Sequence, residues 1–165
     1  MADGDGDADR VLEDARRRSI PVEIVERPAA SSLEEAAALQ GIRPSDIVKT
    51  LVVKRHDGSY LFALVPGDRQ IAWAKLRAAV GVNRLRLPDA AAALEATGYE
   101  RGTITPFGSS TAWPVYADES ISGRRVSMGA GRHGRSLWVE ADDLVRGFDA
   151  EVADITEPLA PPASA

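Results

Sequence analysis

The sequence predicts a single α+β domain built around a mixed β-sheet. Runs of β-branched and apolar residues follow one another along the second half of the chain, whereas a doubly wound parallel sheet would alternate strictly between strand and helix. The 165 residues suffice for one compact domain with its own core and leave little for a second, and no internal repeat is present. These observations favour one mixed sheet with helices packed beside it.

Local capping signals predict the helices. Ser32-Leu33-Glu34-Glu35 is a capping box, in which the serine oxygen and the glutamate carboxylate satisfy each other's backbone amides, and Gly41 can end the helix that follows. Pro88-Asp89 opens an alanine-rich helix that stops at Gly98. The remaining expected helices cover residues 11–15, the stretch around 73–80 with Asp68 as its cap, and 142–148.

Short apolar runs predict the strands. Residues 47–53 and 60–65 are separated by a turn at 56–59 that contains a glycine, so they are expected to form a hairpin in the core. The other expected strands are 21–25, which resembles an edge strand, 113–117, 125–128, 136–140 and 151–155.

Composition limits the classes of function. Cysteine is absent, which excludes disulfides, thiol catalysis by the protein and thiolate metal sites, and a reducing cytoplasm is the expected compartment. Residues 1–8 are acidic, unlike a signal peptide, and no apolar run approaches the ~20 residues that cross a bilayer. We expect a domain over 9–157, disordered ends at 1–8 and 158–165, and no contact with a membrane.

The net charge of −5 disfavours binding along a nucleic-acid duplex but leaves room for a small local contact. Basic side chains are concentrated at Arg124, Arg125, Arg132 and Arg135. From the sequence, this group is either part of a solvated loop or a patch that faces a phosphate.

Lys49 stands in an otherwise apolar strand, on the same face as Ile47, Leu51 and Val53. A lysine removed from water loses several kcal/mol of hydration unless an anion or hydrogen-bond acceptors replace it. A ligand phosphate is one candidate partner; the alternative is that the amine reaches water at the sheet edge.

Two glycine-rich segments are candidate binding loops. Residues 98–108 combine three glycines with Pro106, so their main chain can approach a ligand closely, although a plain connector would have the same composition. Residues 129–134 have dinucleotide-fingerprint spacing but precede a strand instead of a helix, which leaves an anion-friendly turn that carries Arg132 and His133. Two histidines without clustered carboxylates make a metal site unexpected, no cofactor is indicated, and neither a Gly-x-Ser-x-Gly elbow nor a phosphate-binding P-loop occurs.

Taken together, four segments resemble the YbaK/ProRS-associated (YbaK/EbsC) editing-domain family over about residues 20–156. They are Asp46-Ile47-Val48-Lys49-Thr50-Leu51-Val52-Val53, Leu64-Val65-Pro66-Gly67-Asp68, Gly102-Thr103-Ile104-Thr105-Pro106-Phe107-Gly108 and Val115-Tyr116-Ala117-Asp118-Glu119-Ser120. The resemblance implies a mixed, strongly curved sheet flanked by helices. It also implies a deacylase that acts in trans on the acceptor end of a mischarged tRNA, with alanine or cysteine on proline tRNA as the expected substrate.

The resemblance assigns roles to individual residues. Lys49 would hold the phosphate or acyl end of the terminal adenosine, and the Gly102-to-Pro106 main chain would cradle the ester, so Lys49, Gly102 and Pro106 are the expected catalytic residues. His133 matches a histidine found in part of the family, and Asp118 falls in a segment where a structural role is as plausible as a functional one. The expected substrate-binding residues are Thr50, Thr103, Ile104, Thr105, Phe107, Gly108, Gly131, His133 and Asp118.

The mechanism that the resemblance implies needs no protein nucleophile, because water or the substrate's own thiol attacks the ester while the neighbouring ribose hydroxyl assists. The protein would orient the ester and stabilise the oxyanion. Two alternatives stay open: a module that binds aminoacyl ends or a synthetase without hydrolysis, and a nucleotide-binding regulatory domain. A synthetase partner and a monomeric or homodimeric state are compatible with the sequence.

Overall fold

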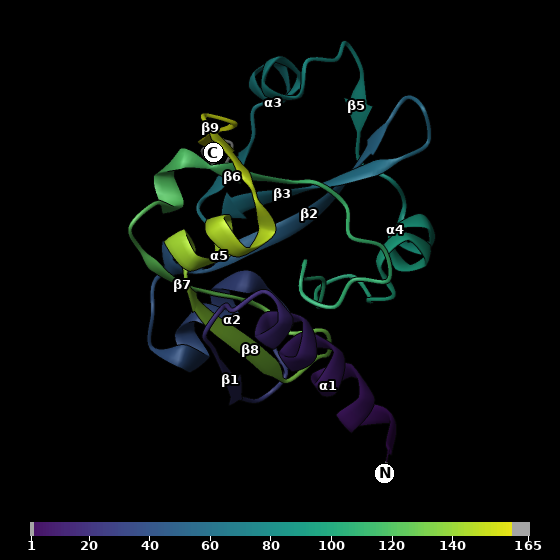
Figure 1. The fold of residues 1–165 in the computed structure, drawn as a ribbon. Coiled ribbons are helices and arrows are strands. Elements are labelled where there is room, and N and C mark those ends of the chain that lie inside the picture. The colour runs from purple at the N-terminus through teal and green to yellow at the C-terminus, as the bar shows by residue number, and fades with distance from the viewer. Residues whose placement is uncertain (1, 160–165) are drawn as a thin grey trace.

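The computed structural model describes residues 2–159, with side chains described from Arg10 onward (Figure 1). The elements in chain order are α1 (Ala2–Arg17), β1 (Val22–Glu26), α2 (Leu33–Gln40), η1 (Pro44–Asp46), β2 (Val48–Arg55), β3 (Tyr60–Pro66), β4 (Arg69–Ile71), α3 (Trp73–Val80), β5 (Leu85–Arg86), α4 (Ala90–Thr97), β6 (Val115–Asp118), η2 (Glu119–Ile121), β7 (Arg125–Gly129), β8 (Arg135–Glu140), α5 (Ala141–Phe148), β9 (Glu151–Ala153) and β10 (Thr156–Pro158). The α+β class is therefore confirmed.

The strands are divided among three sheets, which corrects the expectation of one strongly curved sheet. A five-stranded sheet has the order β5-β2-β3-β6-β9, a three-stranded sheet has the order β1-β8-β7, and β10 pairs with β4. The five-stranded sheet is mixed as expected, because β2 and β3 are antiparallel whereas β3, β6 and β9 run parallel. Periodicity along the chain identifies strands but carries no information on which strand edges meet, and this is why the division was not foreseen.

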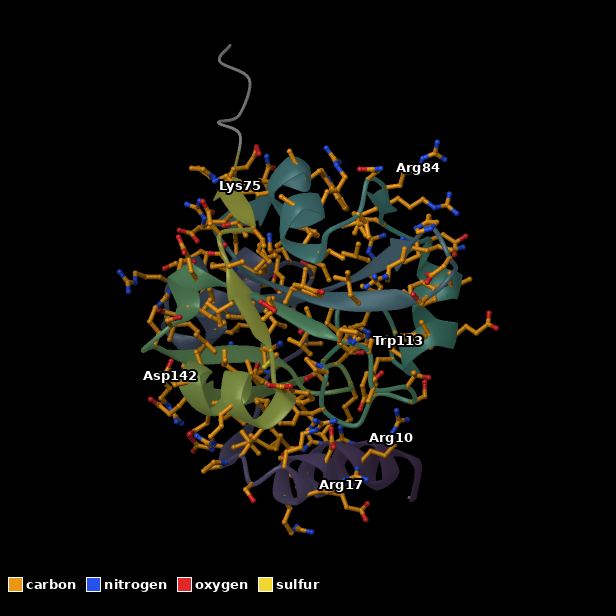
Figure 2. All side chains as sticks on the ribbon, turned by 45° about the horizontal axis from the view of Figure 1, so that its top comes forward. Arg10, Arg17, Lys75, Arg84, Trp113 and Asp142 are labelled. Carbon is orange, nitrogen blue, oxygen red and sulfur yellow. The ribbon has the colours of Figure 1, made fainter. Side chains whose placement is uncertain are left out.

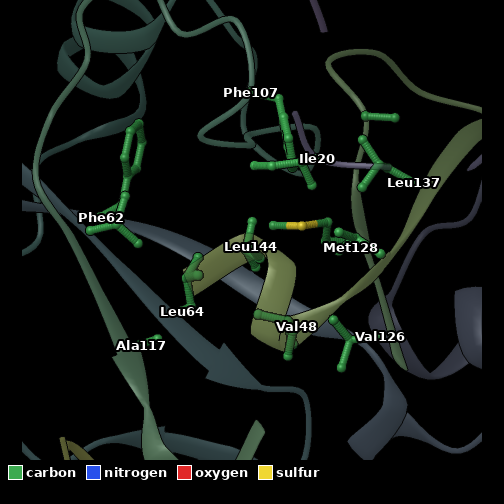
Figure 3. Packing of buried hydrophobic residues seen from close by; sticks show 14 of the residues in the cluster. Ile20, Val48, Phe62, Leu64, Phe107, Ala117, Val126, Met128, Leu137 and Leu144 are labelled. Atoms are coloured by element: carbon green, nitrogen blue, oxygen red, sulfur yellow. The ribbon is translucent and has the colours of Figure 1, made fainter. Parts of the chain in front are cut away.

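The main core lies between the two larger sheets. Figure 3 shows Leu144 of α5 among Leu64 and Val48 of the five-stranded sheet and Met128 of the three-stranded sheet. The other face of the five-stranded sheet packs against α3 and β4 through a second cluster, which includes Val53, Leu61, Leu76 and Ile155. The five-stranded sheet is consequently covered on both faces, and its β2 edge borders the site described below.

Most local predictions are confirmed. Ser32 caps α2 by accepting from the Glu35 amide at 3.1 Å, and Gly41 ends the helix in the left-handed conformation. The capping box itself is only half formed, because the Glu35 carboxylate accepts from the hydroxyl of Ser31 at 3.1 Å and not from Ser32. Asp68 does not cap α3: Ala72 occupies that position, and the strand β4, which was not expected, separates the two.

The chain ends differ in how far the structure describes them. Helix α1 includes most of the acidic segment 1–8 for which composition predicts disorder. At the other end, β10 extends to Pro158, while residues 160–165 lie outside the described part. No helix of residues 2–159 has the length and apolar character that a bilayer crossing requires.

Candidate active site

A cavity of about 830 Å³ opens beside the edge of β2. Its walls come from the segment before and at the start of α2, the middle of β2, the start of α4, the loop after α4, and the β7–β8 hairpin. The lining residues used below are Arg27, Lys49, Thr50, Arg101, Gly102, Ile104, Ser127, Gly129, His133 and Ser136. Segments far apart in the sequence therefore meet at one site.

Strand β2 presents an unpaired edge to this cavity. Its partner β5 pairs only with Lys54 and Arg55, and a single bridge joins Ile47 to Ser127 of β7. Between these points, the outer edge of β2 from Lys49 to Val53 has no strand partner among the described residues. A ligand can approach this edge and meet side chains from both faces of the sheet, since successive residues of a strand alternate.

Lys49 is half-buried, and its ammonium donates a hydrogen bond of 2.6 Å to the carbonyl oxygen of Arg69 in β4. It shares the face of β2 with Leu51 and Val53, as the alternation predicts, and these two residues belong to the cluster under α3. Burial lowers the pKa of Lys49, and the negative charges of Asp68 and Glu34 oppose that shift. The amine is therefore partly desolvated, has one neutral acceptor, and also borders a second cavity of about 310 Å³ on its own side of the sheet.

Gly102 and Ile104 bring main chain to the cavity wall. Gly102 has φ +90°, which favours glycine, and a Cβ there would lie 3.6 Å from Cε1 of His133. The backbone amides of Gly102 and Ile104 donate to no acceptor within residues 2–159, although the carbonyl of Thr103 between them accepts from the Gly131 amide at 3.0 Å. These two amides remain available to a ligand oxygen.

Contacts with β7 and with α1 hold the remainder of this loop in place. Gly129 packs so closely that a Cβ there would lie 2.6 Å from the carbonyl oxygen of Ile104. On the far side, the Gly108 amide donates to Asp14 at 2.8 Å, and Arg10 donates to the Gly108 carbonyl at 2.6 Å. Figure 2 shows Arg10 reaching from α1 toward the body of the domain. The loop is therefore held by contacts on both sides and is not a free connector.

Thr50 has a buried hydroxyl with no partner. The residue is 9% exposed, and its Oγ1 forms no hydrogen bond within the described part of the chain. Its side chain lies on the opposite face of β2 from Lys49, with Val48 and Val52, which belong to the main core. Buried polar groups are nearly always satisfied, so an unpartnered one at a cavity wall points to a ligand.

The structure divides the residues proposed from the sequence into two groups. Those at the cavity wall are Lys49, Thr50, Gly102, Ile104 and His133. Those behind the wall are Thr103, Thr105, Pro106, Phe107, Gly108 and Gly131, which do not line the cavity. Several of the second group hold the loop in place: Phe107 accepts from the Tyr99 hydroxyl at 2.6 Å, and Thr103 donates to the Glu100 carbonyl at 2.7 Å.

His133 and Asp118 have different surroundings. His133 is exposed, and its Nε2 lies 3.5 Å from a carboxylate oxygen of Glu100. Asp118 does not line the cavity: it is 2% exposed and accepts from the amide of Ile155 at 3.1 Å and from the amide and hydroxyl of Ser120. Burial raises the pKa of Asp118, but these hydrogen bonds together outweigh that effect and leave the pKa below its usual value. The carboxylate is thus engaged by contacts within the fold, away from the cavity.

Three of the four arginines that the sequence groups between residues 124 and 135 contact carboxylates of the protein. Arg124 contacts Asp46 at 3.1 Å, Arg125 contacts Glu23 at 2.8 Å, and Arg132 lies 3.6 Å from Glu26. Arg135 is buried. Arg124, Arg125 and Arg132 thus each lie against a carboxylate of the protein, which favours surface ion pairs over a patch that faces a phosphate.

Sequence reasoning missed Arg27, Ser127 and Ser136 at the cavity wall. Arg27 donates to the Ser136 hydroxyl at 2.8 Å, and Ser127 donates to the side-chain oxygen of Gln40 at 3.3 Å. Neither serine stands in a recognisable motif, and Arg27 precedes a proline in what reads as an ordinary loop. Among residues 2–159, no three His, Cys, Asp or Glu side chains are grouped so as to hold a metal ion.

A site of this kind can bind and orient a polar ligand and stabilise negative charge. It offers an ammonium group, free main-chain amides and hydroxyls around one cavity, and within residues 2–159 neither Ser127 nor Ser136 of the cavity wall is hydrogen-bonded to His133. The fold and the site therefore define an α+β domain whose cavity combines positive charge with hydrogen-bond donors.

The chain belongs to the family described as the aminoacyl-tRNA editing domain, whose model matches residues 27–146. It is 32% identical over 130 residues to a candidate Cys-tRNA(Pro)/Cys-tRNA(Cys) deacylase, EbsC, of Enterococcus faecalis, covering 76% of this chain and 77% of that protein. It is also 35% identical over 129 residues to the proline–tRNA ligase of Thermosipho melanesiensis, covering 78% of this chain. The family predicted from the sequence is confirmed.

Two further comparisons concern length and structure. The chain spans about a fifth of the length of the curated proline–tRNA ligases that it matches, for example 23% and 21% in two of them. A solved structure described as a candidate trans-editing enzyme for prolyl tRNA synthetase superimposes with a TM-score of 0.83 at 30% identity, covering 92% of this chain and 97% of that one. The fold is therefore that of an editing domain over nearly all of the chain.

Proposed function

We propose that this protein hydrolyses the ester of a mischarged tRNA in trans and removes a small amino acid such as alanine or cysteine, with proline tRNA as the preferred carrier. The observation that carries the proposal is the shared cavity, which joins Lys49 to the unpaired amides of Gly102 and Ile104. The similarity to EbsC and to the structure described as a candidate trans-editing enzyme supports action in trans. A transient contact with a synthetase is compatible with this role.

The reaction is a simple ester hydrolysis. A water oxygen attacks the carbonyl carbon of the aminoacyl ester, and the carbonyl oxygen becomes an oxyanion. The bond to the ribose oxygen then breaks, and that oxygen takes up the proton that the attacking water gives up, which leaves a free amino acid and a tRNA with its terminal hydroxyl restored. The main-chain amides of Gly102 and Ile104 would donate to the oxyanion, and the ammonium of Lys49 would add positive charge nearby.

An acidic protein can still bind such a substrate, because recognition concentrates on the single-stranded acceptor end. Unstacked RNA bases offer stacking faces and hydrogen-bonding edges, and they need few phosphate contacts. A separate hydrolytic step is needed for a physical reason. A synthetase pocket discriminates against a smaller amino acid by only ~1–3 kcal/mol per missing methylene, so some tRNA is charged with the wrong amino acid.

A deacylation panel tests the proposal. Proline tRNA charged with alanine, cysteine, serine or proline is incubated with the protein, and the loss of each ester is compared with its spontaneous hydrolysis. We expect accelerated loss of at least one small noncognate ester and little loss of the prolyl ester. If the protein binds these tRNAs but accelerates none of the hydrolyses, it is a binding module instead.

A further inference from the structure

Arg27 is held at the cavity wall by hydrogen bonds to the β7–β8 hairpin and to the residue that follows it. It follows β1 directly, and its backbone amide donates to the Gly134 carbonyl at 2.9 Å. Its Nε donates to the Ser136 hydroxyl at 2.8 Å, and its Nη1 donates to the Pro28 carbonyl at 3.0 Å. The side chain is therefore oriented before any ligand arrives, which reduces the entropy lost when a ligand binds.

The charge of Arg27 is not matched by an acid. No carboxylate lies within 4 Å of its guanidinium among the described residues, in contrast to Arg124 and Arg125. Its acceptors are a neutral hydroxyl and a neutral carbonyl, and its Nη2 donates to neither. Partial burial lowers the pKa of Arg27 without any opposing contribution from a nearby acid. Arginine nevertheless stays protonated in proteins, so a positive charge stands uncompensated at the cavity wall.

The cavity as a whole is cationic although the protein is acidic. Arg27, Lys49 and Arg101 line it, and Asp89 supplies its one carboxylate among the described residues. Asp89 is already engaged, because its side chain accepts from the Ala92 amide at the start of α4 at 2.8 Å. An excess of positive charge in this place, within a chain of net charge −5, favours an anionic ligand over a neutral one.

We infer that Arg27 binds the phosphate that links the terminal adenosine to the preceding nucleotide of the tRNA acceptor end. The inference rests on the proposed function and extends it from the ester to the RNA backbone. A guanidinium offers a planar fork that matches two phosphate oxygens, and Nη2 is free to donate. The ester would lie at the Gly102 and Ile104 amides of the same cavity, so phosphate and acyl group are held from different walls.

The test compares two minimal substrates that differ only in the phosphate: the 3′-aminoacyl ester of adenosine 5′-monophosphate and the same ester of adenosine. For the wild type, we expect kcat/KM to be higher with the phosphate, by roughly tenfold to a hundredfold, as for a charge-assisted hydrogen bond. Arg27→Gln should remove this preference, and Arg27→Lys should keep part of it. Because the preference is a ratio measured on one preparation, a smaller folded fraction does not change it.

Arg125→Gln is the matched control, because Arg125 is exposed, paired with Glu23 and outside the cavity. It should leave the preference unchanged. Arg101→Gln tests the other arginine of the cavity wall: loss of the preference in that variant and not in Arg27→Gln would overturn the inference. For a mischarged tRNA, the slope of log affinity against log salt should become shallower by about 0.7 in Arg27→Gln.

Failure of the inference differs from failure of the proposed function. If the wild type hydrolyses both small esters equally well, Arg27 does not recognise the phosphate, and this result needs no variant that must fold. If the wild type hydrolyses neither small ester nor any mischarged tRNA, the proposed function itself is wrong.

Discussion

The ammonium of Lys49 donates to the carbonyl oxygen of Arg69, 20 residues further along the chain, across a distance of 2.6 Å. This contact draws the amine toward β4 on one face of β2, whereas Thr50 lies on the opposite face, where Ile104 packs against the main core. Lys49 and Ile104 therefore reach the same cavity from opposite faces of β2, at its open edge. An ammonium held by one neutral acceptor keeps donors for a ligand, since it has three.

Replacing Lys49 by alanine should lower the rate of deacylation of the best substrate by about 10²–10³-fold, the range found when a donor to an oxyanion is removed. Lys54→Ala is the control, because Lys54 stands in the same strand outside the cavity. Single-turnover deacylation of a mischarged tRNA measures both. An unchanged rate in Lys49→Ala would show that Lys49 does not take part in the reaction.

The lowered pKa of Lys49 predicts a pH dependence of stability. Its folded-state pKa lies below the unfolded value of 10.5, so the unfolded chain binds the proton more tightly. The free energy of unfolding should therefore gain a contribution as pH rises from the folded-state pKa toward 10.5. Urea unfolding of the wild type and of Lys49→Met at a series of alkaline pH values measures this contribution. As pH rises, the free energy of unfolding of the wild type should increase relative to that of Lys49→Met. A difference that is constant with pH would contradict the prediction.

Thr50→Val should separate function from stability. Valine has nearly the same shape and removes a buried hydroxyl without a partner, so the free energy of unfolding should stay equal or rise by about 1 kcal/mol. If Oγ1 binds the substrate, kcat/KM should fall by about 3- to 10-fold. Thr97→Val is the matched control, because Thr97 donates to the Ala93 carbonyl at 2.8 Å and lies outside the cavity. It should lose stability and keep its activity.

Gly102→Ala should impair catalysis through the backbone. At φ +90° an alanine is strained by about 1–2 kcal/mol, and relief of that strain would move the amides that line the cavity. Gly58→Ala is the control: Gly58 has φ +88° with nothing within 4 Å of a Cβ, in the turn between β2 and β3. Both variants should lose comparable stability by thermal unfolding, and only Gly102→Ala should deacylate more slowly. Equal activity in the two would argue against a catalytic role for this main chain.

Asp118→Asn should destabilise the domain by about 3 kcal/mol and leave kcat unchanged in the folded fraction, because the carboxylate accepts from Ser120 and Ile155 outside the cavity. Its folded-state pKa is below the unfolded value of 3.8, so its stabilisation is complete above 3.8 and is lost as pH falls through the lower value. Acid unfolding of the two proteins measures this. A lower kcat in a fully folded Asp118→Asn variant would show that Asp118 takes part in the reaction.

The local elements could be predicted because their signals are local. Ser32 and Gly41 bound α2, and Asp89 and Gly98 bound α4, since a cap needs only neighbouring amides and a glycine that tolerates positive φ. The short strand β5 and the assignment of Asp68 could not be predicted correctly. Strand β5 exists through its pairing with Lys54 and Arg55, and the position of Asp68 is decided by β4 pairing with β10 some 87 residues away.

The residues of the site divide in the same way, into those that local motifs predict and those that only long-range contacts bring to the cavity. Sequence and family resemblance alone placed Lys49, Thr50, Gly102, Ile104 and His133 together, because these residues stand in motifs. Only the tertiary structure shows that Arg27 contacts Ser136, 109 residues further along the chain. It also shows that Pro106 and Asp118 do not line the cavity. Strand and cap propensities act over a few residues, whereas burial, charge pairing and access to a cavity depend on which distant segments become neighbours. The fold alone therefore decided which charges stay unmatched and which amides stay open.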